Sequence, residues 1–289
     1  EGYDVTAVTC GADALREMDS PVDDLTIIAN PENRGAGVAR NTGFPQATGT
    51  YTLFFDGDDD LHPDEIFQTI ARMEQMGADV SINRYEFVRD GSKESTGMNV
   101  VDRALWSQYY EKFLGMTFAV ADAPRFLEFT NYPWNKIILT ERFQKLGLAP
   151  FFGETRVHND VLGHWNTLMN AEKIALIDKT IVTHHVSGKR AHLSNKFGAE
   201  RMDLFVALRS VEALLKAVPG SQRIAYAQVY WPFVRRLVNW AKGRLQKSVE
   251  AQFDAATQAM VEGVTFEELL AVKKSGDSGT YRWLMNKIE

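Results

Sequence analysis

An apolar run that ends in a cluster of carboxylates constrains the fold of this 289-residue chain more than any other feature. Residues 51–55 read YTLFF, which has the length of a strand and the continuous apolar character expected of a strand buried on both faces. The acidic turn Asp56-Gly57-Asp58-Asp59-Asp60 follows directly. Because ligands of α/β sheets bind outside the carboxyl ends of strands, this turn is a candidate ligand site.

Strand and helix patterns alternate on either side of that run. Strands are expected over 4–9, 25–29, 79–84 and 85–88, and helices over 37–46 and 63–76. Such alternation predicts an α/β fold with a mostly parallel sheet flanked by helices. Further along, helices are expected over 106–113, 134–146 and 160–170, and strands over 174–177 and 179–183.

The chain changes character near residue 195. From Phe197 onward the pattern predicts helices over 200–218, 224–249 and 253–261. This part holds 13 basic and 10 acidic residues, which leaves 19 basic and 28 acidic residues before it. We therefore expect an α/β domain over 1–195 and a helical C-terminal region over 196–289.

Composition excludes several classes of protein. The single Cys10 cannot form an internal disulfide, and no cysteine cluster has the spacing of a zinc site. A net charge of −6 argues against a protein devoted to nucleic acid, so no nucleic-acid partner is expected. No apolar run approaches the roughly 20 residues of a membrane span, and nothing resembles a signal peptide, so a cytoplasmic protein is expected.

The acidic turn predicts a metal site. Neighbouring carboxylates repel one another unless a cation neutralises them. Mg²⁺ or Mn²⁺ held by one or two carboxylates usually completes its shell with water and phosphate oxygens, so the implied ligand is a metal-bound diphosphate. The alternative is a solvated loop that caps the following helix.

A glycine-rich segment, NRGAGVARNTG, lies upstream over 33–43. Gly35 and Gly37 allow a ligand to approach the backbone closely, and Arg40 can make a charge-assisted contact with phosphate. The alternative is an ordinary connection between a strand and a helix.

Together, these motifs closely resemble the family-two glycosyltransferases of the GT-A fold. The resemblance rests on Asn-x-Gly-x-x-x-Ala-Arg-Asn-x-Gly over 33–43, ATGTY over 47–51 and FDGDD over 55–59. It implies an inverting enzyme of bacterial surface polysaccharide synthesis, dependent on Mn²⁺ or Mg²⁺. Such an enzyme transfers a hexosyl or N-acetylhexosaminyl group from a nucleotide-diphosphate sugar to a hydroxyl of a glycan or lipid-linked glycan. Among nucleotide-diphosphate sugars, a UDP-sugar is the expected donor.

The resemblance also assigns residues. Asp58 is expected to be the main metal ligand, and Asp56 to lie toward the metal and the ribose and sugar. Donor-binding residues are expected at Asn33, Gly35 and Arg40.

Residues 135–136 (NK), 151–154 (FFGE) and 158–160 (HND) resemble the acceptor half of the same family. There a Glu-Asp pair opens a helix and its Asp is the general base. Asp160 stands in that place, and Asn159 replaces the Glu. A base is needed because the acceptor hydroxyl must lose its proton as it attacks the anomeric carbon. The alternative for Asp160 is a helix N-cap.

A basic cluster follows the strand expected at 179–183. It contains His184, His185, Arg190, His192 and Ser194, and family members often carry a comparable segment here. Histidine can complete a metal shell and arginine can clamp a phosphate, so we assign His185 to the metal and Arg190 to the donor. Which of the three histidines matters is left open, as is the alternative of ordinary surface residues.

The resemblance departs at the N-terminus. The family begins with an apolar first strand, and its second strand ends in paired acids. The first strand is not seen here, so the alternatives are that residues upstream of Glu1 are missing or that the nucleotide pocket is unusual. VTCGAD over 8–13 stands where the second motif belongs, so Asp13 is the remaining candidate for donor binding.

A basic, aromatic stretch over 223–247 has six basic residues and no acidic ones. It predicts peripheral contact with the inner face of a membrane, or a helix packed on the α/β domain. Two other functions stay open: a non-catalytic relative that binds nucleotide-sugar or glycan, and a nucleotidyltransferase, whose glycine-rich signature is not seen near the first strand.

Overall fold

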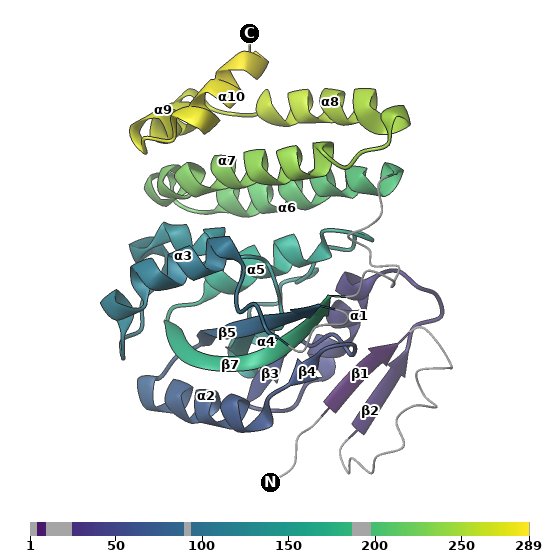
Figure 1. Cartoon of the computed structure of the whole chain (residues 1–289), viewed down its shortest axis with the longest axis vertical. Coiled ribbons are helices and arrows are strands. Elements are labelled where there is room, and N and C mark those ends of the chain that lie inside the picture. The colour runs from purple at the N-terminus through teal and green to yellow at the C-terminus, as the bar shows by residue number, and fades with distance from the viewer. Residues whose placement is uncertain (1–4, 10–24, 90–93, 187–197, 289) are drawn as a thin grey trace.

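The computed structural model describes residues 5–9, 25–89, 94–186 and 198–288. Asp13, Arg190, His192 and Ser194 lie outside these residues, as does the boundary expected at 195. The described chain is layered, with helices on both sides of a central sheet and the C-terminal helices stacked beyond one of these sides (Figure 1).

Five strands form the central sheet, in the order β3-β6-β5-β7-β4. Their bounds are β3 Tyr51–Leu53, β4 Asp60–Leu61, β5 Val80–Arg89, β6 Lys136–Leu139 and β7 Ile174–Val186. A separate parallel pair is formed by β1 (Val5–Thr9) and β2 (Leu25–Ala29).

The central sheet is mixed, which corrects the expectation of a mostly parallel one. Only β5 and β7 pair in parallel, and β3–β6, β5–β6 and β4–β7 are antiparallel. Antiparallel strands need no helical crossover on the sheet face. The chain reaches β6 through three short 3₁₀ turns, at Glu111–Phe113, Val120–Asp122 and Pro124–Glu128, and inserts it between β3 and β5.

The apolar run at 51–55 is not buried on both faces, contrary to expectation. β3 lies at one end of the strand order, its residues are half-buried, and Phe55 is 36% exposed. Phe54 packs instead against the rings of Phe44, Phe151 and Phe152. The apolar character of the run thus reflects an aromatic cluster beside the sheet.

Helices α1 (Ala36–Gly43) and α2 (Pro63–Met76) confirm the predicted helices, with a 3₁₀ turn at Phe44–Gln46 completing the first. The strands predicted over 79–84 and 85–88 are one strand, β5, whose register shifts around Arg84. Likewise β7 joins the two strands predicted at its positions.

The helix predicted over 134–146 is wrong in its first half. That half is β6, and only α4 (Thr140–Lys145) is helical. Ile137 and Ile138 are buried between the two neighbouring strands, and β-branched side chains favour that position. Two further helices, α3 (Val100–Tyr109) and α5 (Asn159–Asn170), cover the sheet on the side that faces the C-terminal region (Figure 1).

The C-terminal region is helical, as predicted. It comprises a 3₁₀ turn at Ala199–Met202, then α6 Asp203–Ala217, α7 Gly220–Lys242, α8 Lys247–Val261, α9 Phe266–Lys274 and α10 Ser278–Ile288. The helix predicted over 224–249 therefore ends at Lys242. Trp165 of α5 packs against Tyr230 and Phe233 of α7, so both regions share one apolar core. No helix among the described residues combines the length and apolarity needed to cross a bilayer.

Candidate active site

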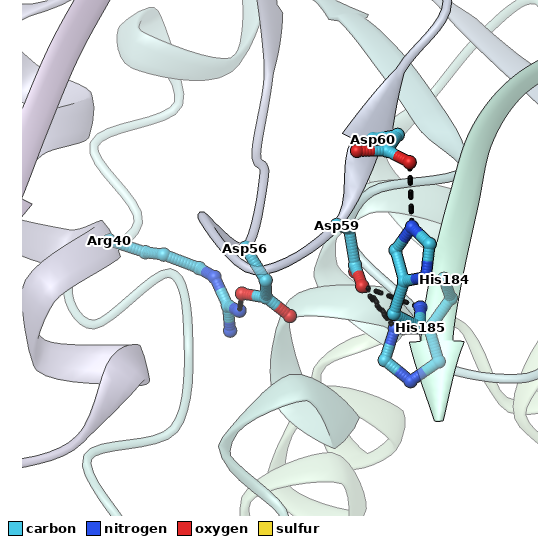
Figure 2. A network of polar contacts seen from close by, with 6 residues as sticks. All are labelled: Arg40, Asp56, Asp59, Asp60, His184 and His185. Carbon is cyan, nitrogen blue, oxygen red and sulfur yellow. Dashed lines mark hydrogen bonds and ion pairs between the residues drawn. The ribbon is translucent and has the colours of Figure 1, made fainter. Parts of the chain in front are cut away.

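The carboxylates of the acidic turn have different partners (Figure 2). Asp56 Oδ1 lies 2.6 Å from Arg40 Nη2, and Asp60 Oδ2 lies 2.6 Å from His185 Nε2. Asp59 accepts from His184, and Asp58 is exposed. Much of the repulsion expected in this turn is therefore offset by cationic or polar side chains of the chain itself.

Asp59 anchors the turn to β7. Its side chain is fully buried, both of its oxygens lie 2.8 Å from His184 Nδ1, and Oδ1 also accepts from the backbone N–H of His185 at 3.0 Å. Burial opposes protonation of His184, but the hydrogen bond and charge of Asp59, with Asp56 and Asp58, raise its pKa. Asp59 is therefore a structural member of the turn.

Arg40 of α1 joins the acidic turn to the start of α5. Its Nη2 meets Asp56, and its Nη1 donates to Asn159 Oδ1 at 3.0 Å. The guanidinium also lies 5.3 Å from the ring centroid of Phe152. Because a planar guanidinium donates along fixed directions, these contacts set the spacing between the two elements.

The glycine-rich segment packs against the loop that leads into α5. A Cβ at Gly37 would lie 1.9 Å from the carbonyl oxygen of Gly153, and Gly35 has φ +94° with Asn33 Oδ1 accepting its N–H. The side-chain amide of Asn41 exchanges two hydrogen bonds with the backbone of Phe152. We expected Gly37 to admit a ligand, and the close approach seen there is by the chain's own loop.

Asp160 lies in the first turn of α5, and the N-cap residue is His158, so the alternative of Asp160 as the N-cap is not observed. Its Oδ2 accepts from Asn131 Nδ2 at 3.4 Å. Burial raises the pKa of Asp160, while Arg40 and Asn131 oppose that rise. A carboxylate with a raised pKa is a stronger base, which suits proton abstraction from a hydroxyl.

Sequence reasoning missed the segment just before β6. Asn131 contacts Asp160, and the rings of Tyr132 and Trp134 stack on each other with centroids 4.3 Å apart. The ring of His184 stacks on Trp134 at 5.5 Å. The run NYPW over 131–134 was the available signal, because binding pockets are lined largely by aromatic and other apolar side chains with a few polar groups.

Lys136 stabilises this segment by hydrogen bonds. It is buried, and its Nζ donates to the carbonyl of Tyr132 and to Asn135 Oδ1, each at 2.7 Å. Burial lowers the pKa of Lys136 to about 7, although Asp102 and Asp160 oppose that effect. The buried lysine therefore holds the backbone of this segment in place.

The donor set of the turn fits a hard divalent cation completed by a diphosphate. Within the described ranges no group of three His, Cys, Asp or Glu side chains converges on a metal position. Mg²⁺ needs only one or two carboxylates when substrate phosphates supply further oxygens, and Asp58 with Asp56 offers that number. The contact with Asp60 uses Nε2 of His185, which leaves only its Nδ1 for a metal.

The basic residues of 223–247 are mostly engaged within the C-terminal region. Arg223 pairs with Glu268, Arg235 with Asp277, and Lys242 with Asp254. Arg236 donates to the carbonyl of Glu128, and Arg244 lies over the ring of Trp240. These contacts support the packed helix among the two alternatives for this stretch.

The chain is similar in sequence to known glycosyltransferases. Residues 12–147 match the family described as Glycosyl transferase family 2. The chain is 33% identical over 93 residues to the succinoglycan biosynthesis protein ExoO of Rhizobium meliloti, covering 30% of this chain and 27% of that protein. It is 24% identical over 216 residues to glycosyltransferase GlyA of Streptococcus pneumoniae, covering 73% of this chain and 29% of GlyA.

Among solved structures, residues 1–349 of S. aureus TarS in complex with UDP-GlcNAc superpose with a TM-score of 0.69 at 16% identity. The match covers 98% of this chain and 81% of that one. The chain thus has the fold of these proteins, and it spans less than a third of the length of the curated relatives it matches.

Proposed function

Because residues 12–147 belong to glycosyl transferase family 2 and the chain has the GT-A fold, we propose that it transfers a sugar from a nucleotide-diphosphate donor to a hydroxyl of a glycan or lipid-linked glycan. The match to a succinoglycan biosynthesis protein supports a role in polysaccharide synthesis. A catalytic region over 1–195 and a helical region from 196 belong to the proposal.

The donor binds at the acidic turn. Asp58 and Asp56 would hold Mn²⁺ or Mg²⁺, and the bound ion would supply positive charge to the departing diphosphate. We assign Asn33, Gly35 and Arg40 to the donor side, together with Asp13 and Arg190, which lie outside the described residues. A UDP-sugar is the first donor to test, because TarS was solved with UDP-GlcNAc and with UDP.

The acceptor binds beside Asp160 and the half-buried ring of Tyr132, which the buried ring of Trp134 supports. Asp160 takes the proton of the acceptor hydroxyl while the hydroxyl oxygen attacks the anomeric carbon. The attack comes from the side opposite the leaving diphosphate, so the configuration at that carbon is inverted. Aromatic rings suit an acceptor built of sugars, because sugar rings present apolar C–H faces. The expected cytoplasmic location and membrane contact through 223–247 stay predictions.

The observation that carries the proposal is the bridge made by Arg40. One guanidinium contacts Asp56 on the donor side and Asn159, the neighbour of Asp160, on the acceptor side. The cation-binding turn and the candidate base therefore border one site, as a single displacement requires.

The test combines binding and turnover. Calorimetric titration with UDP, GDP and CDP, with and without Mn²⁺, identifies the nucleotide, and transfer and donor hydrolysis are then assayed with matching nucleotide-sugars. Metal-dependent binding with turnover supports the proposal. Binding with neither transfer nor hydrolysis would favour a non-catalytic relative.

A further inference from the structure

The start of α5 has an unusual backbone conformation. His158, its N-cap residue, has φ 61° and ψ 21°. Among the described residues it is the one non-glycine residue with positive φ. That region is disfavoured for residues with a Cβ unless their surroundings hold them there. Because His158 lies two residues before Asp160, its conformation sets how the carboxylate is presented.

The contact that holds the His158 side chain comes from the C-terminal region. Arg201, in the 3₁₀ turn before α6, is only 1% exposed, and its Nη1 lies 3.3 Å from His158 Nε2. Burial and the charge of Arg201 lower the pKa of His158 to about 4. The imidazole is therefore neutral near pH 7, and its Nε2 accepts from Arg201 while Nδ1 carries the proton.

Trp240 and Asp203 of the C-terminal region also contact the residues just before α5. The ring of Trp240 in α7 meets the His158 ring edge-on, with centroids 6.0 Å apart, and lies 4.6 Å from the guanidinium of Arg201. Asp203 accepts hydrogen bonds from the backbone N–H groups of Arg156, at 2.9 Å, and Val157, at 3.4 Å. Three successive residues before α5 are thus held by the segment 201–203.

We propose that Arg201 is a positioning residue for Asp160, acting through His158, and that the C-terminal helical region is thereby part of the active site. The proposal rests on the proposed function, in which Asp160 is the base. It assigns Arg201 a role that differs from that of Arg40, which reaches the same helix start from the donor side and contacts Asn159.

A double-mutant cycle on the full chain tests the route through His158. Arg201→Met removes the hydrogen-bond donor to His158. His158→Asn removes the imidazole ring, and asparagine tolerates the left-handed backbone conformation. We expect Arg201→Met to lower kcat roughly 10- to 100-fold, as misplacement of a reacting group does, with the donor KM changed by less than about twofold. The same substitution should cost little more in the His158→Asn background.

Arg201→Lys is the matched conservative variant. A lysine keeps a charged donor for His158 but loses the planar contact with Trp240, so we expect it to recover part of the lost kcat. Effects of Arg201→Met and His158→Asn that simply multiply, or a loss of donor affinity equal to the loss of kcat, would overturn the proposal. Thermal unfolding of each variant identifies any that fail to fold.

A second readout does not depend on turnover. Nuclear magnetic resonance titration of His158 should give the Nδ1–H tautomer and a pKa near 4 in the wild type, rising in Arg201→Met. The carboxyl resonance of Asp160 should titrate at a different pH in folded Arg201→Met than in the wild type. An unchanged Asp160 titration overturns the proposal, whereas a wild type without transfer, despite these shifts, refutes the proposed function alone.

Discussion

Arg40 donates through Nη1 to Asn159 Oδ1 at 3.0 Å, so a residue of the glycine-rich motif contacts the residue next to Asp160. The two are 119 positions apart in the sequence, and the other arm of the same guanidinium meets Asp56. The family resemblance expects a glutamate where Asn159 stands. With a neutral partner there, Arg40 directs its charge toward Asp56 and, through space, toward Asp160.

Replacing Arg40 with lysine should weaken catalysis. Lysine keeps the charge but cannot bridge Asp56 and Asn159 with one rigid fork, so we expect kcat/KM to fall roughly 10- to 100-fold. Steady-state kinetics at saturating metal measure this. Arg84→Lys is the matched control, because Arg84 makes an exposed ion pair with Asp178 and such pairs contribute little. Equal kinetics for both variants would contradict the bridging role.

The pH dependence of transfer should report Asp160. Burial raises its pKa above the ordinary value of 3.8, so activity is lost as pH falls through that raised pKa, where the base becomes protonated. Asn131 favours the ionised form, so Asn131→Ala should raise the pKa further and move the acid limb of kcat/KM to higher pH. Asn170→Ala, at the far end of α5, should leave the limb in place. A shift to lower pH in Asn131→Ala would refute this assignment.

Removal of the Asp160 charge should not destabilise the fold. A carboxyl whose pKa is raised on folding disfavours the folded state at any pH above that pKa, where it must be buried in ionised form. Asp160→Asn should therefore unfold at an equal or higher temperature than the wild type near pH 7. The difference should shrink as pH falls toward 3.8, and calorimetry at several pH values checks it.

The pair of Asp59 and His184 should also make stability fall as pH rises, but over a higher pH range than Asp160 does. The folded pKa of His184 is raised, so its contribution is fully present below about pH 6.5, its unfolded value, and is lost as pH rises through the folded pKa. Asp59→Asn should remove this slope and cost about 1–3 kcal/mol at pH 6, measured by denaturant unfolding without divalent cations. Asp60→Asn, at an exposed side chain, should cost less than about 1 kcal/mol.

Packing at Gly37 should tolerate no side chain. A Cβ there would lie 1.9 Å from a backbone oxygen, so Gly37→Ala should destabilise the chain by about 1–3 kcal/mol and separate α1 from the loop before α5. Gly220→Ala is the control, since nothing lies within 4 Å of its Cβ position. A Gly37→Ala variant as stable as Gly220→Ala would contradict the observed docking.

The sequence predicted what depends on local pattern. Pro63, with acidic residues after it, and the glycine after Met76 mark the two ends of α2. The functional roles of Asp56, Asp58 and Asp160 stay predictions of the family resemblance. What it could not predict depends on distant partners. Lys136–Leu139 falls within the helix predicted over 134–146, and it is a strand because β3 and β5 flank it.

In the candidate site, too, the sequence predicts local features but not the contacts between distant segments. Carboxylates that look equivalent in the acidic turn differ because His184 and His185 arrive from β7, more than a hundred residues later. The contact of Arg201 with His158 has no local signature at all, because it joins two segments that only the packed C-terminal helices bring together.

In the proposed reaction Asp160 acts as the base at a site whose donor is held at Asp58, and a paired measurement of transfer and binding tests this role. Transfer of labelled sugar and affinity for the nucleoside diphosphate are measured side by side in the wild type and in folded Asp160→Asn. We expect wild-type affinity in the variant, with transfer reduced at least about 100-fold, the lower end of the range for general-base catalysis. Wild-type turnover in Asp160→Asn would contradict it.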